Sequence, residues 1–302
     1  MDTRRLRPPA FFLLAALLLV SLPRAISQEG GRRGVTMLIR CDDAGMCHAV
    51  NTALREVLDT GLPVSVSVMF ACPWYQEAVE TLKGRRDVSV GVHLTLNAEW
   101  KNYRWGPVSG AGAVPSLVDS DGYFFPSRAA LFAHAPVTGE VERELTAQIE
   151  RALRSGLRID YLDYHMGAAV NTPALRKLVE RLAHHYRLGI SRYFQEEDLG
   201  GWYAAAPEAK RDTLLRLAGA VEGGPVRLLV FHIGLVTPEM DALADMNSFG
   251  PKEMSRHRQA ELRALTSPEF RKLLNDRGVR FETYGRLISE RALESMTAPA
   301  DE

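Results

Sequence analysis

The sequence is poor in cysteine, and the few cysteines present do not suit a disulfide framework. Cys41, Cys47 and Cys72 are an odd number in a chain of 302 residues, whereas disulfide-stabilised domains carry paired cysteines at higher density. Cys41 and Cys47 show a C-x5-C spacing with no second pair, which is weak spacing for a zinc thiolate site. We therefore expect all three to be small buried side chains.

The sequence also lacks an excess of charge of either sign. Its 37 basic residues balance 37 acidic residues, and the two kinds are interleaved along the chain. Proteins that follow a phosphate backbone need a clustered basic surface, so no nucleic-acid partner is expected. No G-x-S-x-G motif occurs, and Gly91 and Gly106 do not form a phosphate-cradling loop, which argues against serine hydrolases and nucleotide enzymes.

Long apolar runs are absent except near the start of the chain. Residues 11–20 are apolar, three arginines precede them and small residues follow. The run is too short to cross a hydrocarbon layer of ~30 Å at ~1.5 Å per residue. The order is typical of a secretory leader. We predict a signal peptide at residues 1–27, with a single-pass anchor as the alternative, and an exported domain at residues 28–302 that is periplasmic or extracellular and has no membrane span.

The rest of the chain alternates between two hydrophobic patterns. β-Branched apolar runs predict strands, and apolar residues at helical spacing predict helices. The expected strands are 35–40, 64–70, 88–96, 159–164, 226–232 and 279–283; the expected helices are 49–58, 74–82, 141–153 and 174–186, with two more around Pro268. This order predicts an α/β fold, a regular or irregular (β/α) barrel of eight strands or fewer in a single domain.

Between residues 97 and 135 the pattern gives way to Gly, Pro, Ser and aromatic residues. A loop of this length inside a compact domain is usually functional, and its aromatic content argues against a disordered insert. The aromatic residues either face a ligand or form a hydrophobic lid packed on the barrel.

Polar side chains gather where the predicted strands end. Active sites of barrels and open α/β sheets form at the carboxyl edge of the strands. We therefore expect one site to bring together Asp42, Asp43, His93, Asp163, His165 and His232.

Asp42 and Asp43 are adjacent carboxylates. Two such groups do not both ionise cheaply when buried unless a cation lies between them. One carboxylate can bind a metal ion while the other acts on water as a general base. The alternative is that the pair caps the following helix.

The histidines complete the candidate site. His93 and His165 with one carboxylate suit Zn²⁺, Mn²⁺ or Fe²⁺ better than Mg²⁺, and Asp163, two residues before His165, lies on the same strand face and is expected to orient it. Taken alone, a histidine placed like His93 or His165 is more often a structural core residue than a metal ligand. His232 is either a proton donor or a structural histidine that closes its strand.

Several short motifs resemble those of the YdjC-like (ChbG-type) carbohydrate deacetylases. LIRCDDAGM resembles the family's NADDFG opening, GVHLTLN its G-x-H-L-x-L block, DYHMG its D-x-H block and FHIG its HPG block, and RQAELRAL with RGVRFETY resembles its closing segment. The likeness runs from about residue 36 to residue 288, and the blocks come in the same order.

The resemblance implies a barrel-like fold, often dimeric, that removes N-acetyl groups from amino sugars such as chitooligosaccharides. It implies that Asp43, His93 and His165 bind one divalent ion, Mg or Zn with Mn or Fe as alternatives. Asp42 would be the base, and His232 the acid or transition-state partner.

An acetylated amino-sugar substrate also calls for binding residues. Trp100, Tyr103 and Trp105 are expected to stack against sugar faces, with the packed lid as the alternative. Arg258, in the closing segment, is expected to contact substrate.

The chain departs from the family pattern at Ala44, Met166, Gly167 and Ile233. These positions would line the pocket wall, so they bear on the substrate more than on the reaction. Two other functions fit the same residues: another metal-dependent hydrolase, such as a phosphoesterase, peptidase or other amidase, and a non-catalytic sugar-binding protein on the same fold.

Overall fold

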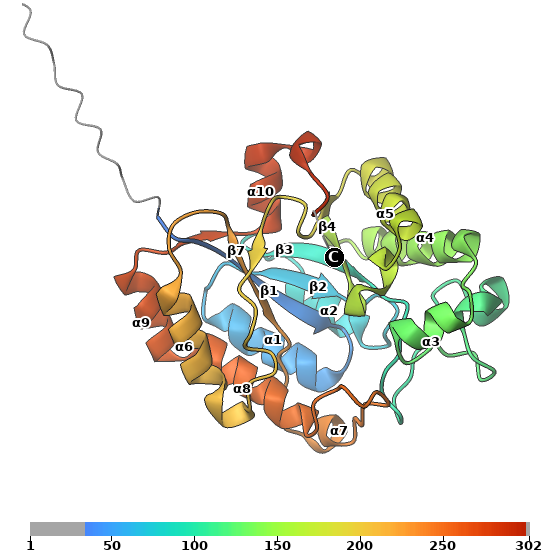
Figure 1. Cartoon of the computed structure of the whole chain (residues 1–302), viewed down its shortest axis with the longest axis horizontal. Helices are drawn as coiled ribbons and strands as arrows, with labels where there is room; N and C mark the ends of the chain where they lie inside the picture. The colour runs from blue at the N-terminus through green and yellow to red at the C-terminus, as the bar shows by residue number, and fades with distance from the viewer. Residues whose placement is uncertain (1–33, 300–302) are drawn as a thin grey trace, which may run out of the picture. The chain divides into compact units, whose positions relative to one another are not determined.

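A computed structural model describes residues 34–299, which fold as one α/β unit (Figure 1). The leader predicted at residues 1–27 lies outside the described residues and stays a prediction. Among the residues described, none of the helices has both the length and the apolar character needed to span a bilayer.

The centre of the unit is a curled sheet of eight parallel strands. The strand order is β5-β4-β3-β2-β1-β7-β6, and β8 also pairs with β1. Their bounds are β1 Thr36–Ala44, β2 Ser65–Val68, β3 Ser89–Leu94, β4 Ile159–Tyr164, β5 Gly189–Ile190, β6 Glu197–Asp198, β7 Arg227–Phe231 and β8 Arg280–Glu282. Within residues 34–299 no pairing joins β5 to β6, so the predicted α/β barrel-like fold is confirmed in an open, irregular form.

Helices flank the curled sheet (Figure 1). They are α1 His48–Asp59, α2 Tyr75–Leu82, α3 Arg128–Ala133, α4 Thr138–Arg154, α5 Pro173–Tyr186, α6 Lys210–Ala220, α7 Pro238–Asp241, α8 Met254–Thr266, α9 Pro268–Asp276 and α10 Tyr284–Arg291. The predicted helices are all present, with starts and ends within a few residues of those expected. The short strands β5 and β6 and helices α3, α6, α7 and α10 were not predicted.

Alternate residues of each strand face opposite sides of the sheet, and this alternation sorts the core into two parts. Met37, Ile39 and Cys41 of β1 belong to the large cluster between sheet and helices, whereas Leu38 belongs to a small cluster inside the curl. Arg40 follows Leu38 on the inner face. The strands therefore send every second side chain inward, toward the space that the curl encloses.

Aromatic side chains fill the end of that space that lies away from the carboxyl edge of the strands. Tyr161 of β4 and Tyr284 at the start of α10 have ring centroids 4.2 Å apart, and both are fully buried. The Tyr284 backbone N–H donates to Ser65 Oγ, and the Tyr161 hydroxyl lies 2.9 Å from Ser67 Oγ. Helix α10 thus covers the end of the curl away from the predicted site.

The aromatic segment between residues 97 and 135 packs into the core. Trp100, Trp105, Leu117 and Phe124 are all buried in the large cluster. The Trp105 indole N–H donates to the Asn97 carbonyl at 2.7 Å. The segment is therefore an ordered wall of the domain.

The close approach of β3 to Tyr161 requires glycine at position 91. A Cβ built on Gly91 would lie 2.4 Å from Tyr161 Cζ, and that ring is held by neighbours on both sides. Gly91→Ala should lower the free energy of unfolding by about 1–3 kcal/mol through overpacking, measured by denaturant midpoint. Gly139→Ala in the first turn of α4, where nothing lies within 4 Å of the added methyl, is the matched control and should be neutral or slightly stabilising. Equal midpoints for the two variants would contradict this account.

Candidate metal centre and active site

Inner-facing side chains of neighbouring strands meet at the carboxyl edge of the sheet. On β3, His93 follows Gly91 on the inner face, and on β4, Asp163 follows Tyr161. His165 begins the turn directly after β4, and His232 directly follows β7. Because all these strands are parallel, the side chains arrive at one edge.

Asp43 joins this set through an unusual backbone conformation. In a regular strand adjacent side chains point to opposite faces, so Asp42 and Asp43 would diverge. The pairing of β1 with β2 shifts register between Cys41 and Ala44, and Asp43 has a φ of 63°. This left-handed conformation is uncommon outside glycine, although aspartate tolerates it. The turn allows both carboxylates to line one cavity.

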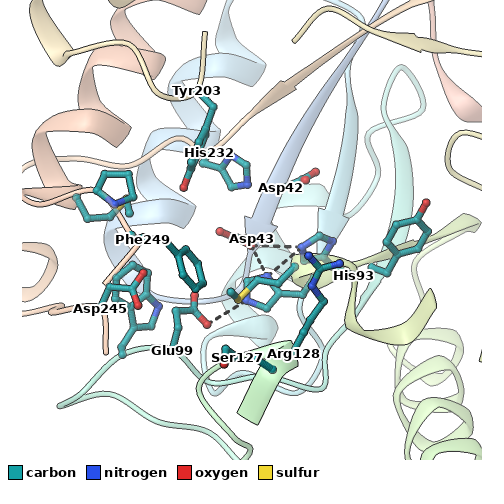
Figure 2. A pocket seen from close by; sticks show the side chains of 18 of the residues that line it. Asp42, Asp43, His93, Glu99, Ser127, Arg128, Tyr203, His232, Asp245 and Phe249 are labelled. Atoms are coloured by element: carbon teal, nitrogen blue, oxygen red, sulfur yellow. Dashed lines mark hydrogen bonds and ion pairs between the residues drawn. The ribbon is translucent and has the colours of Figure 1, made fainter. Parts of the chain in front are cut away.

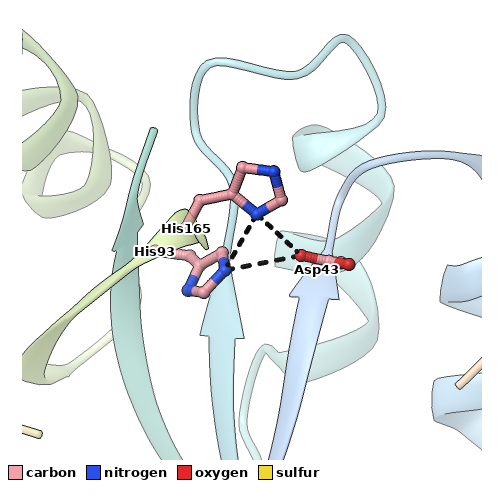
Figure 3. A group of neighbouring side chains, drawn as sticks. All are labelled: Asp43, His93 and His165. Atoms are coloured by element: carbon pink, nitrogen blue, oxygen red, sulfur yellow. Dashed lines mark hydrogen bonds and ion pairs between the residues drawn. The ribbon is translucent and has the colours of Figure 1, made fainter. Parts of the chain in front are cut away.

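Asp43, His93 and His165 bring three ligand atoms together in a nearly equilateral triangle (Figure 3). Asp43 Oδ1 lies 3.4 Å from His93 Nε2 and 3.3 Å from His165 Nδ1, and the two nitrogens are 3.3 Å apart. All three side chains are buried. The structure thus places the three predicted ligands around one point.

The hydrogen bonds on the far side of each imidazole determine what faces that point. His93 Nδ1 lies 2.8 Å from Asp163 Oδ2, and His165 Nε2 lies 3.1 Å from Glu99 Oε2. A carboxylate partner takes the N–H of a neutral imidazole, which leaves the opposite nitrogen with a lone pair. Asp43 Oδ1 has no hydrogen-bond partner among the described residues. Three lone pairs therefore point at one another, an arrangement that suits a cation.

Without an ion between them, the charges around the triangle favour protons on the two imidazoles, and a metal ion would displace those protons. Burial would raise the pKa of Asp43, but the Arg258 guanidinium, 2.7 Å from Asp43 Oδ2, and the two imidazoles hold that pKa well below its usual range. Burial would lower the pKa of His93, but Asp163 and the Asp43 contact raise it to about 9. For His165, burial is likewise outweighed by Glu99 and Asp43, and the pKa rises to about 10. The site stabilises positive charge at the shared point.

The triangle forms the floor of a cavity of about 610 Å³ (Figure 2). Its wall includes Asp42, His232 and Arg258 together with Trp100 from the segment after β3. The volume lies within the range typical of small-molecule sites. The cavity is therefore large enough for a ligand to reach the three ligand atoms.

Asp42 is held on the inner face by a buried arginine. Arg40 Nε and Nη2 each donate to one Asp42 oxygen at 2.7 Å, and Arg40 Nη1 lies 2.9 Å from Asp163 Oδ1. Arg40 thus links the carboxylate beside the triangle to the carboxylate behind His93. A bidentate pair of this kind fixes the orientation of the carboxylate plane.

His232 differs from the other two histidines of the cavity. No carboxylate of the described residues contacts its ring, and its buried Nδ1 has no hydrogen-bond partner there. Its backbone N–H donates to Glu261 Oε2 at 2.7 Å, and Glu261 Oε1 accepts from the fully buried Lys210 at 2.9 Å. The main chain of His232 is anchored while its ring remains available to a ligand.

Two of the predicted aromatic residues do not reach the cavity. Trp105 is buried against the Asn97 carbonyl, and the Tyr103 hydroxyl donates to the Met46 carbonyl. The lid alternative therefore describes Tyr103 and Trp105, while Trp100 and Arg258 do line the cavity. Arg258 makes its ion pair with Asp43.

The expected partner of Asp163 was wrong. Asp163 shares a strand face with His165, but its carboxylate binds His93, its register partner on the neighbouring strand β3. The partner of His165 is Glu99, a buried residue that the sequence did not single out because it lies in a segment without a periodic pattern.

Comparison with known proteins adds a family to this geometry. A family model described as YdjC-like protein matches residues 36–276. A carbohydrate deacetylase of Thermus thermophilus is 33% identical over 269 residues, covering 81% of this chain and 90% of the relative. A carbohydrate deacetylase of Brevibacillus brevis is 25% identical over 274 residues, covering 83% and 99%.

A solved structure shows the same fold. It is a protein of Enterococcus faecalis named for cellobiose-phosphate cleavage, with a TM-score of 0.69 and 24% identity over 84% of this chain and 99% of that one. The motif resemblance is confirmed by the family match, and the chain belongs to the YdjC-like family.

Proposed function

We propose that this protein is a metal-dependent deacetylase that removes the acetyl group from N-acetylated amino sugars. The observation that carries the proposal is the buried triangle of lone pairs on Asp43, His93 and His165, at the floor of a cavity that also holds Asp42 and His232. The carbohydrate deacetylases among its relatives support the substrate class.

The residues of the triangle fit a divalent metal ion. Asp43 Oδ1, His93 Nε2 and His165 Nδ1 lie 3.3–3.4 Å from one another, so these three residues would hold one ion between them. Two imidazoles and one carboxylate favour zinc over magnesium. We infer that zinc is the resident ion.

A bound divalent ion would polarise the acetyl carbonyl and lower the pKa of water beside it. Asp42 is positioned to take the proton from that water, since each of its oxygens keeps a free lone-pair direction beside its bond to Arg40. The water oxygen bonds to the acetyl carbon, the carbon–nitrogen bond breaks, and His232 donates a proton to the departing amine. Acetate and a free amino sugar result.

The proposals on location and assembly rest on the sequence alone. We infer from the leader pattern at residues 1–27 that the enzyme acts after export, on amino sugars in the periplasm or outside the cell. The homodimer implied by the family resemblance is likewise a proposal.

Replacing His165 removes one of three ligands. His165→Ala should lose bound metal and reduce acetate release from N,N′-diacetylchitobiose by at least about a hundredfold. Metal content by mass spectrometry and acetate by enzymatic assay check both effects. His184→Ala, on the exposed side of α5, is the matched control. Full activity in His165→Ala refutes the metal assignment, and release of phosphate from a sugar phosphate by a wild type that releases no acetate from diacetylchitobiose would identify a phosphoesterase.

Replacing Glu99 should weaken metal binding without removing a ligand. Glu99→Gln takes the charge from the group that orients His165, so metal affinity should fall about 10–100-fold, as measured by competition with a chelating dye. Glu56→Gln, on the exposed face of α1, is the control. Unchanged affinity in Glu99→Gln would show that His165 needs no carboxylate partner.

Replacing His232 should separate proton transfer from metal binding. His232→Ala should retain full metal content while kcat falls by about 10²–10⁴-fold. The contrast with His165→Ala is the test. Loss of metal in His232→Ala would place His232 among the ligands.

A further inference from the structure

Two large aromatic side chains stand exposed at the catalytic cavity. Phe249 is 71% exposed and Tyr203 is 45% exposed, and both line the cavity above the metal centre. Figure 2 shows Tyr203 on the His232 side of the cavity and Phe249 on the Glu99 and Asp245 side. Phe249 is the most exposed of the large apolar residues in the described part of the chain. Exposed apolar surface of this kind at a cavity is typical of a binding site.

The buried side chain of Lys210 holds Tyr203 in place. Lys210 Nζ donates to the Tyr203 carbonyl at 2.7 Å and lies 5.3 Å from the centre of the Tyr203 ring. The ring also contacts His232 edge-on, with centroids 5.2 Å apart. Tyr203 therefore keeps its place beside the proposed proton donor while almost half of its surface faces solvent.

Backbone hydrogen bonds join the loop that carries Phe249 to the segment that carries Glu99. The Met246 N–H donates to the Glu99 carbonyl and the Lys101 N–H donates to the Ala244 carbonyl, both at 2.8 Å. A Cβ on Gly250 would lie 2.0 Å from Asp245 Oδ2, so glycine allows the Asp245 side chain to pack directly against this part of the loop. The shape of the loop presents Phe249 beside Glu99, the residue that orients His165.

Unpaired polar groups lie in the same cavity. Within residues 34–299 no hydrogen bond or ion pair engages the side chains of Arg128 or Asn171, which both line the cavity. The Asp245 carboxylate lines it too. A ligand that fits must offer an apolar face to the aromatic rings and hydrogen-bonding groups around its edge. A pyranose ring has this division, with C–H bonds on its faces and hydroxyls around its rim.

We propose that Phe249 and Tyr203 form the sugar-binding platform of this enzyme and stack on the C–H faces of pyranose rings, an inference that rests on the proposed function. They take the role that the sequence suggested for Tyr103 and Trp105. Neither touches the triangle of ligand atoms, so both act on binding of the substrate and not on retention of the metal.

Binding of N,N′-diacetylchitobiose to metal-free protein, by isothermal titration calorimetry, tests the platform apart from catalysis. Phe249→Ala and Tyr203→Ala should each weaken binding about tenfold, which corresponds to loss of one stacking contact. Phe249→Trp and Tyr203→Phe keep a ring and should bind as the wild type does. In the metal-loaded enzyme, Phe249→Ala should raise KM about tenfold with kcat and metal content unchanged.

Two controls make the outcome decisive. Tyr123→Ala removes an exposed aromatic ring outside this cavity and should leave binding unchanged. Phe249→Leu keeps an apolar side chain without a ring, and wild-type affinity in that variant overturns stacking. Wild-type affinity in Phe249→Ala, or no binding of diacetylchitobiose by the wild type, also overturns the proposal. Sugar binding that depends on Phe249 without any acetate release would uphold the platform and refute the deacetylase.

Discussion

Three lone pairs that face one another inside a protein are unfavourable unless a positive charge lies between them, and the architecture of this domain is arranged around that constraint. The three ligand atoms, on Asp43, His93 and His165, are fixed in place, because the opposite side of each side chain binds a charged partner. Arg258 holds the first, Asp163 the second and Glu99 the third. Folding offsets the unfavourable free energy of bringing the three ligand atoms together, so the site is preorganised for a cation.

Two ion pairs that lie fully inside the domain also serve to position residues of the site. Arg40 with Asp42, and Lys210 with Glu261, are buried. Such pairs contribute little net stability compared with apolar packing, because both charges lose their hydration. Each pair instead ends on a residue of the site: Arg40 orients Asp42, and Glu261 anchors the main chain of His232. Their value lies in geometry rather than in stability.

Much of the fold could be predicted because its main strands and helices have clear periodicity; β4 has the same bounds in sequence and structure. The convergence of His93 and His165 also follows from sequence, since parallel strands end at one edge. The pairing of Asp163 with His93 does not, because it depends on the register between β3 and β4. Glu99 and Phe249 come from loops without periodicity, and composition alone cannot tell which aromatic residues pack inward and which line the cavity.

Arg40 orients Asp42, and it also couples two carboxylates electrostatically. One guanidinium serves both the Asp42 carboxylate and the Asp163 carboxylate behind His93. The proposed base and the carboxylate that orients one proposed metal ligand therefore share a single counter-charge, so a change in the charge of either carboxylate affects the other. Asp42 on β1 and His93 on β3 thus belong to one electrostatic unit, although they lie on different strands.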